Sequence, residues 1–452
     1  MPQSSTYPTG PRLGFHYFPD TVHYREQDLQ AWLPDLLSLG AAWLTLLAPL
    51  ERAIPEFFLN GLLESGIQPV LHFPAQVGQM PEVRELGTLL EHYARWGVNY
   101  VAFYDSPNSR ANWRPDLWAQ INLVERFLDL YIPQAEMAKD LGLTPVFPPL
   151  EPGGDYWDLA FLSTALRSLR RRGYASLLEK LVLGAYAWSN DHPMDWGKGG
   201  TARWSEARPY YTPPGSQDQR GLYIFDWYIE ASRKALGISL PILLLRAGSC
   251  LPGNPEGMLD AGMQHALFNL GLARLISGDS HEEPNSEPVA TELLTCNFWL
   301  LAAAEGSPYA EQAWFKPDGS KLPVVDVFRH WIAGKREPKS LDEIRPSQES
   351  DVLQCETSED EFQEDPPHRN IDHYVLLPLY AWGAADWDLA AIQPLLQDGH
   401  PTIGFSLAEA RLAARVTVVG GEGAVSTEAL TMLQSAGCRV ERLMEDGTLV
   451  AT

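Results

Sequence analysis

Short apolar runs alternate with amphipathic stretches over residues 12–335 of the chain. The amphipathic stretches repeat apolar residues at helical spacing, and several end at a glycine, such as Gly40 and Gly66. The apolar runs are short and read as strands. The pattern predicts eight strands. The first seven cover residues 13–19, 41–49, 67–74, 99–105, 143–150, 180–188 and 240–249, and the eighth lies inside residues 293–305.

Eight strand–helix units predict an α/β protein whose first domain, residues 1–335, is a (β/α)8 TIM barrel. Continuous apolar strands are typical of parallel sheets that are covered on both faces. An open doubly wound sheet is the alternative, but no G-x-G-x-x-G follows the first strand. After strand four, the pattern predicts one long helix over residues 116–142.

After the barrel, the composition of the chain predicts two further segments. Residues 336–370 are acidic and lack apolar periodicity, which predicts a flexible linker. Residues 371–452 return to strand and helix patterns, and they predict a small Rossmann-like α/β module.

Composition narrows the classes of partner. The formal net charge of −24 argues against nucleic acid, because phosphate binding requires a basic surface. The four cysteines show no metal-ligand spacing, so we expect no metal and no cofactor. We also expect no membrane span, since no apolar run is long enough. The sequence does not predict the oligomeric state.

Chemistry in such a barrel is expected at the C-terminal ends of the strands. Strand four ends in "FYDSPNS" and strand seven in "ILLLRAGS". On these two motifs, residues 12–335 resemble the large superfamily of (β/α)8 glycoside hydrolases. That superfamily carries Asn-Glu-Pro at the first place and a strand ending in Glu-Ala-Gly at the second.

The resemblance implies a catalytic acid on strand four and a nucleophile on strand seven. This chain has Ser106 and Arg246 at those positions. A serine does not protonate a glycosidic oxygen near neutral pH, and an arginine is neither nucleophile nor base. The usual retaining pair is therefore expected to be missing, unless a register one residue earlier places Asp105 in the acid position.

Further carboxylates follow predicted strand ends: Asp20, Glu51, Glu151 and Glu305. Asp105 and Glu151 follow neighbouring strands, so they are the candidate catalytic pair. The alternative is that these acids are solvated loop residues in an acid-rich chain.

The segment Tyr186–Gly221 after strand six is far longer than a barrel loop requires, and it is rich in aromatic residues. Aromatic faces stack on sugar rings, while acids, amides and imidazoles bind hydroxyl groups. We interpret the segment as a sugar-binding lid, with a simple cover over the barrel as the alternative. The candidate substrate-binding residues are Tyr104, Asn108, Trp188, Asp191, His192, Asp195, Trp196, Arg246, Trp299, Glu305 and Trp314.

Residues 416–452 resemble the second type of cell-wall-binding repeat of Gram-positive surface proteins. The matching letters include Gly420-Gly421, "AVS" at 424–426 and the helix end at Gly437. The resemblance implies cell-wall polysaccharide as a partner and a secreted or cell-surface location. The first residues show no signal-peptide pattern, so a cytoplasmic location stays open as well.

Three functions stay open at this point. The first is a glycan-binding, glycosidase-like barrel without the usual glutamate pair, associated with cell-envelope polysaccharide. The second is an active glycoside hydrolase that uses Asp105 and Glu151. The third is an intracellular scaffold or assembly protein.

Overall fold

The computed structural model describes residues 10–118, 121–251, 261–279, 289–336 and 371–378, together with part of residues 391–451. Within that last range it omits residues 393, 396–400, 405–406, 412, 421–424, 426 and 444–448. The chain divides into two compact units, residues 1–344 and 345–452.

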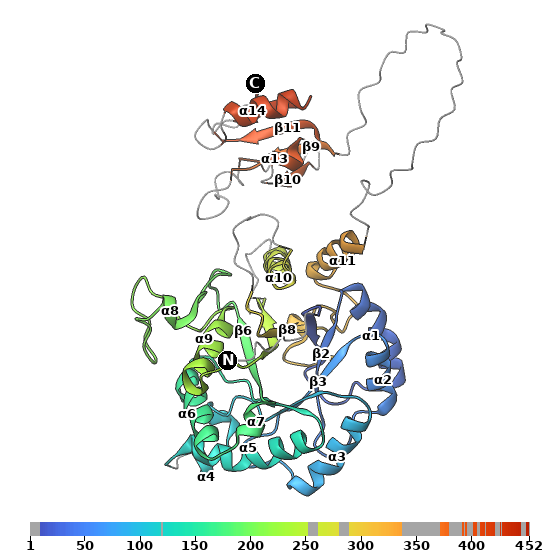
Figure 1. The fold of residues 1–452 in the computed structure, drawn as a ribbon. Helices are drawn as coiled ribbons and strands as arrows, with labels where there is room; N and C mark the ends of the chain where they lie inside the picture. The colour runs from blue at the N-terminus through green and yellow to red at the C-terminus, as the bar shows by residue number, and fades with distance from the viewer. Residues whose placement is uncertain are drawn as a thin grey trace, which may run out of the picture. The chain divides into compact units, whose positions relative to one another are not determined.

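The first unit contains a closed barrel of eight parallel strands, which confirms the predicted barrel (Figure 1). The strands pair in sequence order, and β1 pairs with β8 to close the ring. The strands are β1 (Leu13–His16), β2 (Trp43–Leu47), β3 (Gln68–Phe73), β4 (Tyr100–Phe103), β5 (Thr144–Phe147), β6 (Val182–Trp188), β7 (Ile242–Gly248) and β8 (Leu293–Phe298).

Helices surround the barrel, and the longer ones have an apolar face that contributes buried residues to its core. They are α1 (Glu26–Ser38), α2 (Glu56–Glu64), α3 (Val83–Arg95), α4 (Pro115–Trp118), α5 (Leu123–Asp140), α6 (Asp158–Arg171), α7 (Ala175–Leu178), α8 (Gly200–Arg203), α9 (Ile224–Leu236), α10 (Ala261–Ser277) and α11 (Pro323–Arg336). In this part of the chain, no described helix is apolar over a length that would cross a bilayer.

The prediction of one long helix over residues 116–142 is wrong, because the chain forms two helices, α4 and α5, with a break between them. Asn122 lies at the break, with a φ angle of 64°. A left-handed residue cannot continue a right-handed helix, and asparagine adopts this conformation more readily than most residues.

A one-residue bulge in β7 affects the end of the barrel. Ala185 of β6 pairs with Leu244, but the next residue, Tyr186, pairs with Arg246. Leu245 is therefore the extra residue, and the pairing of β7 with β8 is also irregular between Leu244 and Ala247. A bulge changes the direction of the side chains that follow it. Here it places Arg246 at the level of Tyr186, with Leu245 in the core inside the barrel.

The second unit contains a five-stranded sheet in the order β10-β9-β11-β12-β13, in which the only antiparallel pair among the described strands is β12 with β13. Its elements are β9 (Ile371–Leu376), β10 (Thr402–Gly404), α13 (Leu407–Ala410), β11 (Ala413–Val419), α14 (Thr427–Ser435), β12 (Arg439–Leu443) and β13 (Leu449–Ala451). The unit is thus α/β, while its description as Rossmann-like stays a prediction. Residues 337–370 of the expected linker lie outside the described residues.

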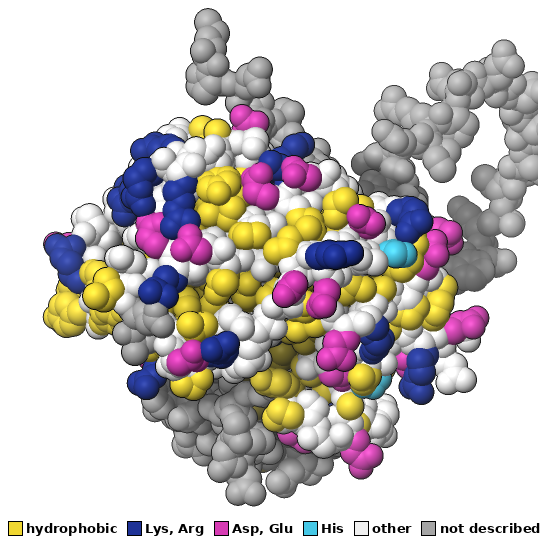
Figure 2. Space-filling model, turned by 90° about the horizontal axis from the view of Figure 1, so that it is seen from below, with side chains coloured by type: hydrophobic (Ala, Val, Ile, Leu, Met, Phe, Trp, Pro, Cys, Tyr) yellow, Lys and Arg dark blue, Asp and Glu magenta, His cyan; other side chains and the backbone are white. Residues whose placement is uncertain are grey.

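The surface of the barrel unit mixes charges of both signs. Figure 2 shows one face on which basic and acidic side chains are interspersed with apolar ones. The net charge of −24 therefore does not form a single acidic field over that face.

Candidate functional site

An ion pair occupies the mouth of the barrel, the end at which the strands finish. Nη2 of Arg246, on β7, lies 3.5 Å from Oδ2 of Asp105, which follows β4. The guanidinium also lies 4.7 Å from the ring centres of both Tyr186 and Trp299. Aromatic faces attract a cation, so the two rings and the carboxylate together hold the guanidinium in place.

The surroundings keep Asp105 ionised. Burial alone would raise the pKa of its carboxyl, but the charge of Arg246 and the hydrogen bond from Ser106 lower it below its usual value. The Ser106 hydroxyl donates a hydrogen bond of 2.8 Å to Oδ1 of Asp105. Ser106 is itself buried, so its hydroxyl supports Asp105 and does not face the open cleft.

Two histidines form the floor of the mouth. Nε2 of His72 donates to the carbonyl oxygen of Tyr104 at 2.8 Å, because that oxygen can only accept. Burial lowers the pKa of both His16 and His72, so each ring is neutral near pH 7. Nδ1 of His72 is therefore an acceptor, and it is buried without a hydrogen-bond partner among the described residues, as are both ring nitrogens of His16.

Glu151, on the loop after β5, is fixed through its backbone. Oδ1 of Asn108 accepts from the Glu151 N–H at 2.8 Å, and Nδ2 of Asn108 donates to the Glu151 carbonyl at 2.8 Å. A second bond from Nδ2 reaches the Tyr156 carbonyl at 3.0 Å. The close fit requires a glycine at 154, since a Cβ there would lie 2.7 Å from Nδ2 of Asn108.

The surroundings of the Glu151 carboxyl favour its ionised form less than those of Asp105 do. Burial raises its pKa, and the charges of Asp105 and Asp158 raise it further, while Arg246 lowers it. The environments of Asp105 and Glu151 thus move their two pKa values in opposite directions.

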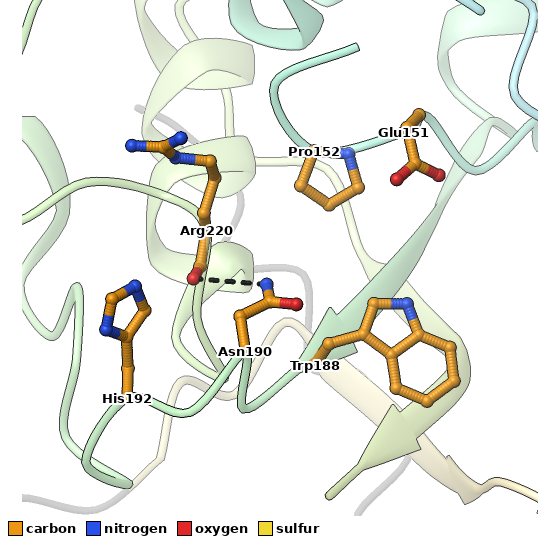
Figure 3. Close-up of a pocket in the computed structure, with 6 residues that line it drawn as sticks. All are labelled: Glu151, Pro152, Trp188, Asn190, His192 and Arg220. Carbon is orange, nitrogen blue, oxygen red and sulfur yellow. Dashed lines mark hydrogen bonds between the residues drawn. The ribbon is translucent and has the colours of Figure 1, made fainter. Parts of the chain in front are cut away.

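A cleft of about 380 Å³ adjoins the mouth (Figure 3). It is formed by the β5 loop and the segment after β6, and its lining residues are Glu151, Pro152, Trp188, Asn190, His192 and Arg220. Trp188 connects the cleft with the mouth, because its ring packs edge-on against Trp299, at 6.1 Å between centres. The cleft combines an aromatic wall with a few polar groups, which is typical of a small-molecule site.

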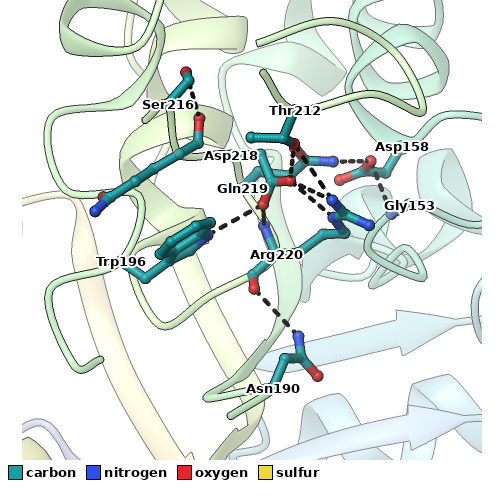
Figure 4. Close-up of polar contacts among 10 residues, drawn as sticks. Gly153, Asp158, Asn190, Trp196, Thr212, Ser216, Asp218, Gln219 and Arg220 are labelled. Atoms are coloured by element: carbon teal, nitrogen blue, oxygen red, sulfur yellow. Dashed lines mark hydrogen bonds and ion pairs between the residues drawn. The ribbon is translucent and has the colours of Figure 1, made fainter. Parts of the chain in front are cut away.

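The segment Tyr186–Gly221 is ordered by a buried carboxylate (Figure 4). Asp218 accepts hydrogen bonds from the side chains of Arg220, Thr212 and Trp196. Burial would raise the pKa of Asp218, but these donors more than offset it and lower the pKa. Trp196 in turn stacks on His192 at 3.9 Å between ring centres. The network therefore positions one wall of the cleft.

A second buried carboxylate, Asp158, joins this segment to the barrel. Its oxygens accept from the Gly153 N–H at 3.2 Å, Nε2 of Gln219 at 2.7 Å and the Tyr228 hydroxyl at 3.0 Å. Burial raises the pKa of Asp158 to about 6 in spite of these donors. The residue links the Glu151 loop, the long segment and α9.

The structure brings several predicted residues together at the mouth and the cleft: Asp105, Glu151, Trp188, His192, Arg246 and Trp299. Asn108 and Trp196 lie one layer behind, where they position the loops. Asp191, Asp195 and Glu305 are exposed. Their proposed part in binding stays a prediction.

Two predicted site residues lie in the hydrophobic core instead, which corrects the expectation that they face the cleft. Trp314 is fully buried and packs edge-on against Phe15 and Phe328. Tyr104 is buried beside Phe127, and its hydroxyl accepts from Gln134 on α5.

Three parts of the site were not predicted from the sequence: Tyr186, the place of the two histidines at its floor, and the networks of Asp158 and Asp218. Tyr186 had a usable signal, because it precedes Trp188 by two positions, and alternate strand residues share a face. Its hydroxyl is near enough to Asp105 to lower the pKa of that carboxyl, but it makes no well-aligned hydrogen bond. Among the described residues, no group of three or more His, Cys, Asp or Glu side chains is arranged to hold a metal ion.

No protein-family model matches the chain, and no curated protein matches it. Solved structures that resemble it include a GH128 (subgroup II) endo-beta-1,3-glucanase from Sorangium cellulosum, at 14% identity over 70% of this chain and 97% of that one, with a TM-score of 0.39. Xylanase 10B from Thermotoga maritima is 11% identical over 72% of this chain and 95% of that one, with a TM-score of 0.42. CelM2, a bifunctional glucanase-xylanase from a metagenome library, is 10% identical over 72% and 76%, with a TM-score of 0.42. At these identities and scores they assign the chain to no family.

Proposed function

We propose that the barrel binds a glycan at its mouth and in the adjoining cleft, and that it does so without the usual retaining pair of glutamates. The observation that carries the proposal is the ion pair between Arg246 and Asp105. A guanidinium held between two aromatic rings stands at the end of β7, where the resemblance to glycoside hydrolases implies a nucleophile.

The chemistry of the lining supports a sugar as the ligand. Trp188 and Trp299 supply aromatic surface, and the neighbouring groups supply both donors and acceptors. Nδ1 of His72 accepts, whereas Nε of Arg246 donates, and both are buried without a partner. A hydroxyl group both donates and accepts, so a sugar suits a site whose surroundings offer groups of both kinds.

The envelope association is a further part of the proposal, and it rests on the C-terminal resemblance alone. The full chain is expected to co-sediment with isolated Gram-positive cell walls. If the protein stays in the supernatant, the proposed envelope association is contradicted, while the proposed function of the barrel is unaffected.

An active hydrolase is the second candidate, and one observation favours it. The pKa of Glu151 is raised while that of Asp105 is lowered, which is the division expected between a general acid and a nucleophile or base. In that reaction Glu151 would protonate the leaving oxygen, and Asp105 would attack the anomeric carbon or activate a water molecule.

The test combines calorimetric binding of soluble oligosaccharides to the full-length protein with measurement of released reducing ends. We expect binding without hydrolysis, and a loss of at least about tenfold in affinity for Trp188→Ala, or roughly 1.4 kcal/mol. Trp188→Tyr should keep most of the affinity because it keeps an aromatic face. Hydrolysis that Asp105→Asn or Glu151→Gln abolishes would favour the second candidate, and binding to no sugar would contradict both.

A further inference from the structure

The charges around the cleft do not cancel. Arg246 is paired with Asp105, and Arg220 is paired with Asp218, so the charge of each cation already has a counter-ion. The carboxylate of Glu151 lines the cleft and has no hydrogen-bond or ion-pair partner within the described parts of the chain. The cleft therefore contains one uncompensated negative charge.

Nearby acids strengthen this negative potential. Asp105 and Asp158 both raise the pKa of Glu151, and although Arg246 lowers it, the pKa stays above its usual value. A positive group brought beside Glu151 would relieve this repulsion, whereas an anionic group would add to it. The structure thus disfavours uronic acids and sulfated sugars as occupants.

The aromatic wall of the cleft also favours a cationic ligand. Trp188 lines the cleft together with Glu151, and Figure 3 shows the two on one side of it, with His192 and Arg220 on the other. An indole face packs against the apolar face of a sugar ring, and it also attracts a cation. Trp188 and Glu151 can therefore bind the ring and the charge of a single ligand.

We propose that the cleft selects a sugar that carries a protonated amino group, with its ammonium group paired to Glu151 and its ring packed on Trp188. The inference rests on the proposed glycan-binding function and specifies its ligand class. An N-acetyl group in place of the amine would remove the charge, and the selected ligand is accordingly a deacetylated amino sugar.

The test is calorimetric titration of the full-length protein with three oligosaccharides of equal length, made of glucosamine, N-acetylglucosamine and glucose. We expect the glucosamine oligomer to bind at least about tenfold more tightly than the other two, a difference of roughly 1.4 kcal/mol. The preference should shrink when salt is raised, because salt screens a partly exposed ion pair. This second measurement needs only the wild-type protein.

Glu151→Gln should bring the three affinities to within about twofold of one another, since it removes the charge and keeps the shape. The matched control is Glu179→Gln, which removes the same charge from an exposed residue before β6, and it should keep the preference. Equal affinities in the wild type, or a preference that survives Glu151→Gln, would overturn the inference and leave glycan binding intact. If none of these three sugars binds, and no other soluble oligosaccharide binds either, the inference and the proposed function are both overturned.

Discussion

The guanidinium of Arg246 lies 3.5 Å from the carboxylate of Asp105, and this pair joins the end of β7 to the end of β4. The side chains are 18% and 21% exposed, so water screens the pair only in part. Each charge depends on the other, because a charge left unpaired at a largely buried position is costly.

Arg246→Met is expected to lower the free energy of unfolding by about 2 kcal/mol, since it leaves Asp105 without its counter-ion. Adding Asp105→Asn should recover part of the loss, because the double variant contains no unpaired charge. Urea denaturation of the two single variants and the double variant measures this coupling. If the loss in the double variant equals the sum of the losses in the two single variants, the two residues do not stabilise the fold as a pair.

The carboxyl of Asp158 should make stability depend on pH. Its pKa is about 6 in the folded protein against an ordinary value of 3.8, so the folded state binds the proton more tightly. Its contribution is complete below about pH 4 and is lost as the pH rises through about 6, up to roughly 3 kcal/mol at 1.36 kcal/mol per pKa unit.

Asp158→Asn tests this assignment, since the amide cannot titrate. The stability of the wild type minus that of the variant should fall between about pH 4 and about pH 7, measured by chemical denaturation at each pH. Taking the difference cancels other titrating groups. A difference that stays flat across this range would contradict the assignment.

Asn108→Ala should detach the Glu151 loop from the β4 loop. The change removes three hydrogen bonds to backbone groups, and we expect a loss of about 2 kcal/mol in unfolding free energy. Asn108→Asp is the informative comparison, because it can still accept from the Glu151 N–H but cannot donate to the two carbonyls. In thermal denaturation, the stability of Asn108→Asp should equal that of Asn108→Ala or lie between it and that of the wild type. If both variants are as stable as the wild type, the hydrogen bonds of Asn108 do not hold the Glu151 loop.

Asp218→Asn should loosen the segment Tyr186–Gly221 without unfolding the barrel. The amide loses the charge that holds Arg220, so amide hydrogen exchange in this segment should speed up by about tenfold or more, for roughly 1.4 kcal/mol of local stability. Glu206→Gln, an exposed acid of the same segment, serves as the control and should leave exchange unchanged. Unchanged exchange in Asp218→Asn would show that the network does not order the segment.

The barrel was predictable because its signal is repeated: eight apolar runs, each followed by an amphipathic stretch, specify the same unit. The site was predictable only in part. Trp314 and Trp299 both follow strand eight in the sequence, and either suits a core or a cleft. What separates them is that Trp314 packs against Phe328 and against Phe15, which lies at the other end of the barrel sequence. The break at Asn122 and the networks of Asp158 and Asp218 likewise depend on backbone geometry and partners that no local pattern specifies.

The bulge at Leu245 has a consequence for anyone who transfers residue roles to this chain by alignment. Counting forward from the start of β7 in step with β6 brings Leu245 opposite Tyr186, whereas the residue at that level is Arg246. An alignment without a gap at this position would assign the role of the mouth residue to a leucine and discard the arginine as part of the outer layer. Residue roles transferred to β7 from a strand of regular pairing must therefore skip one position.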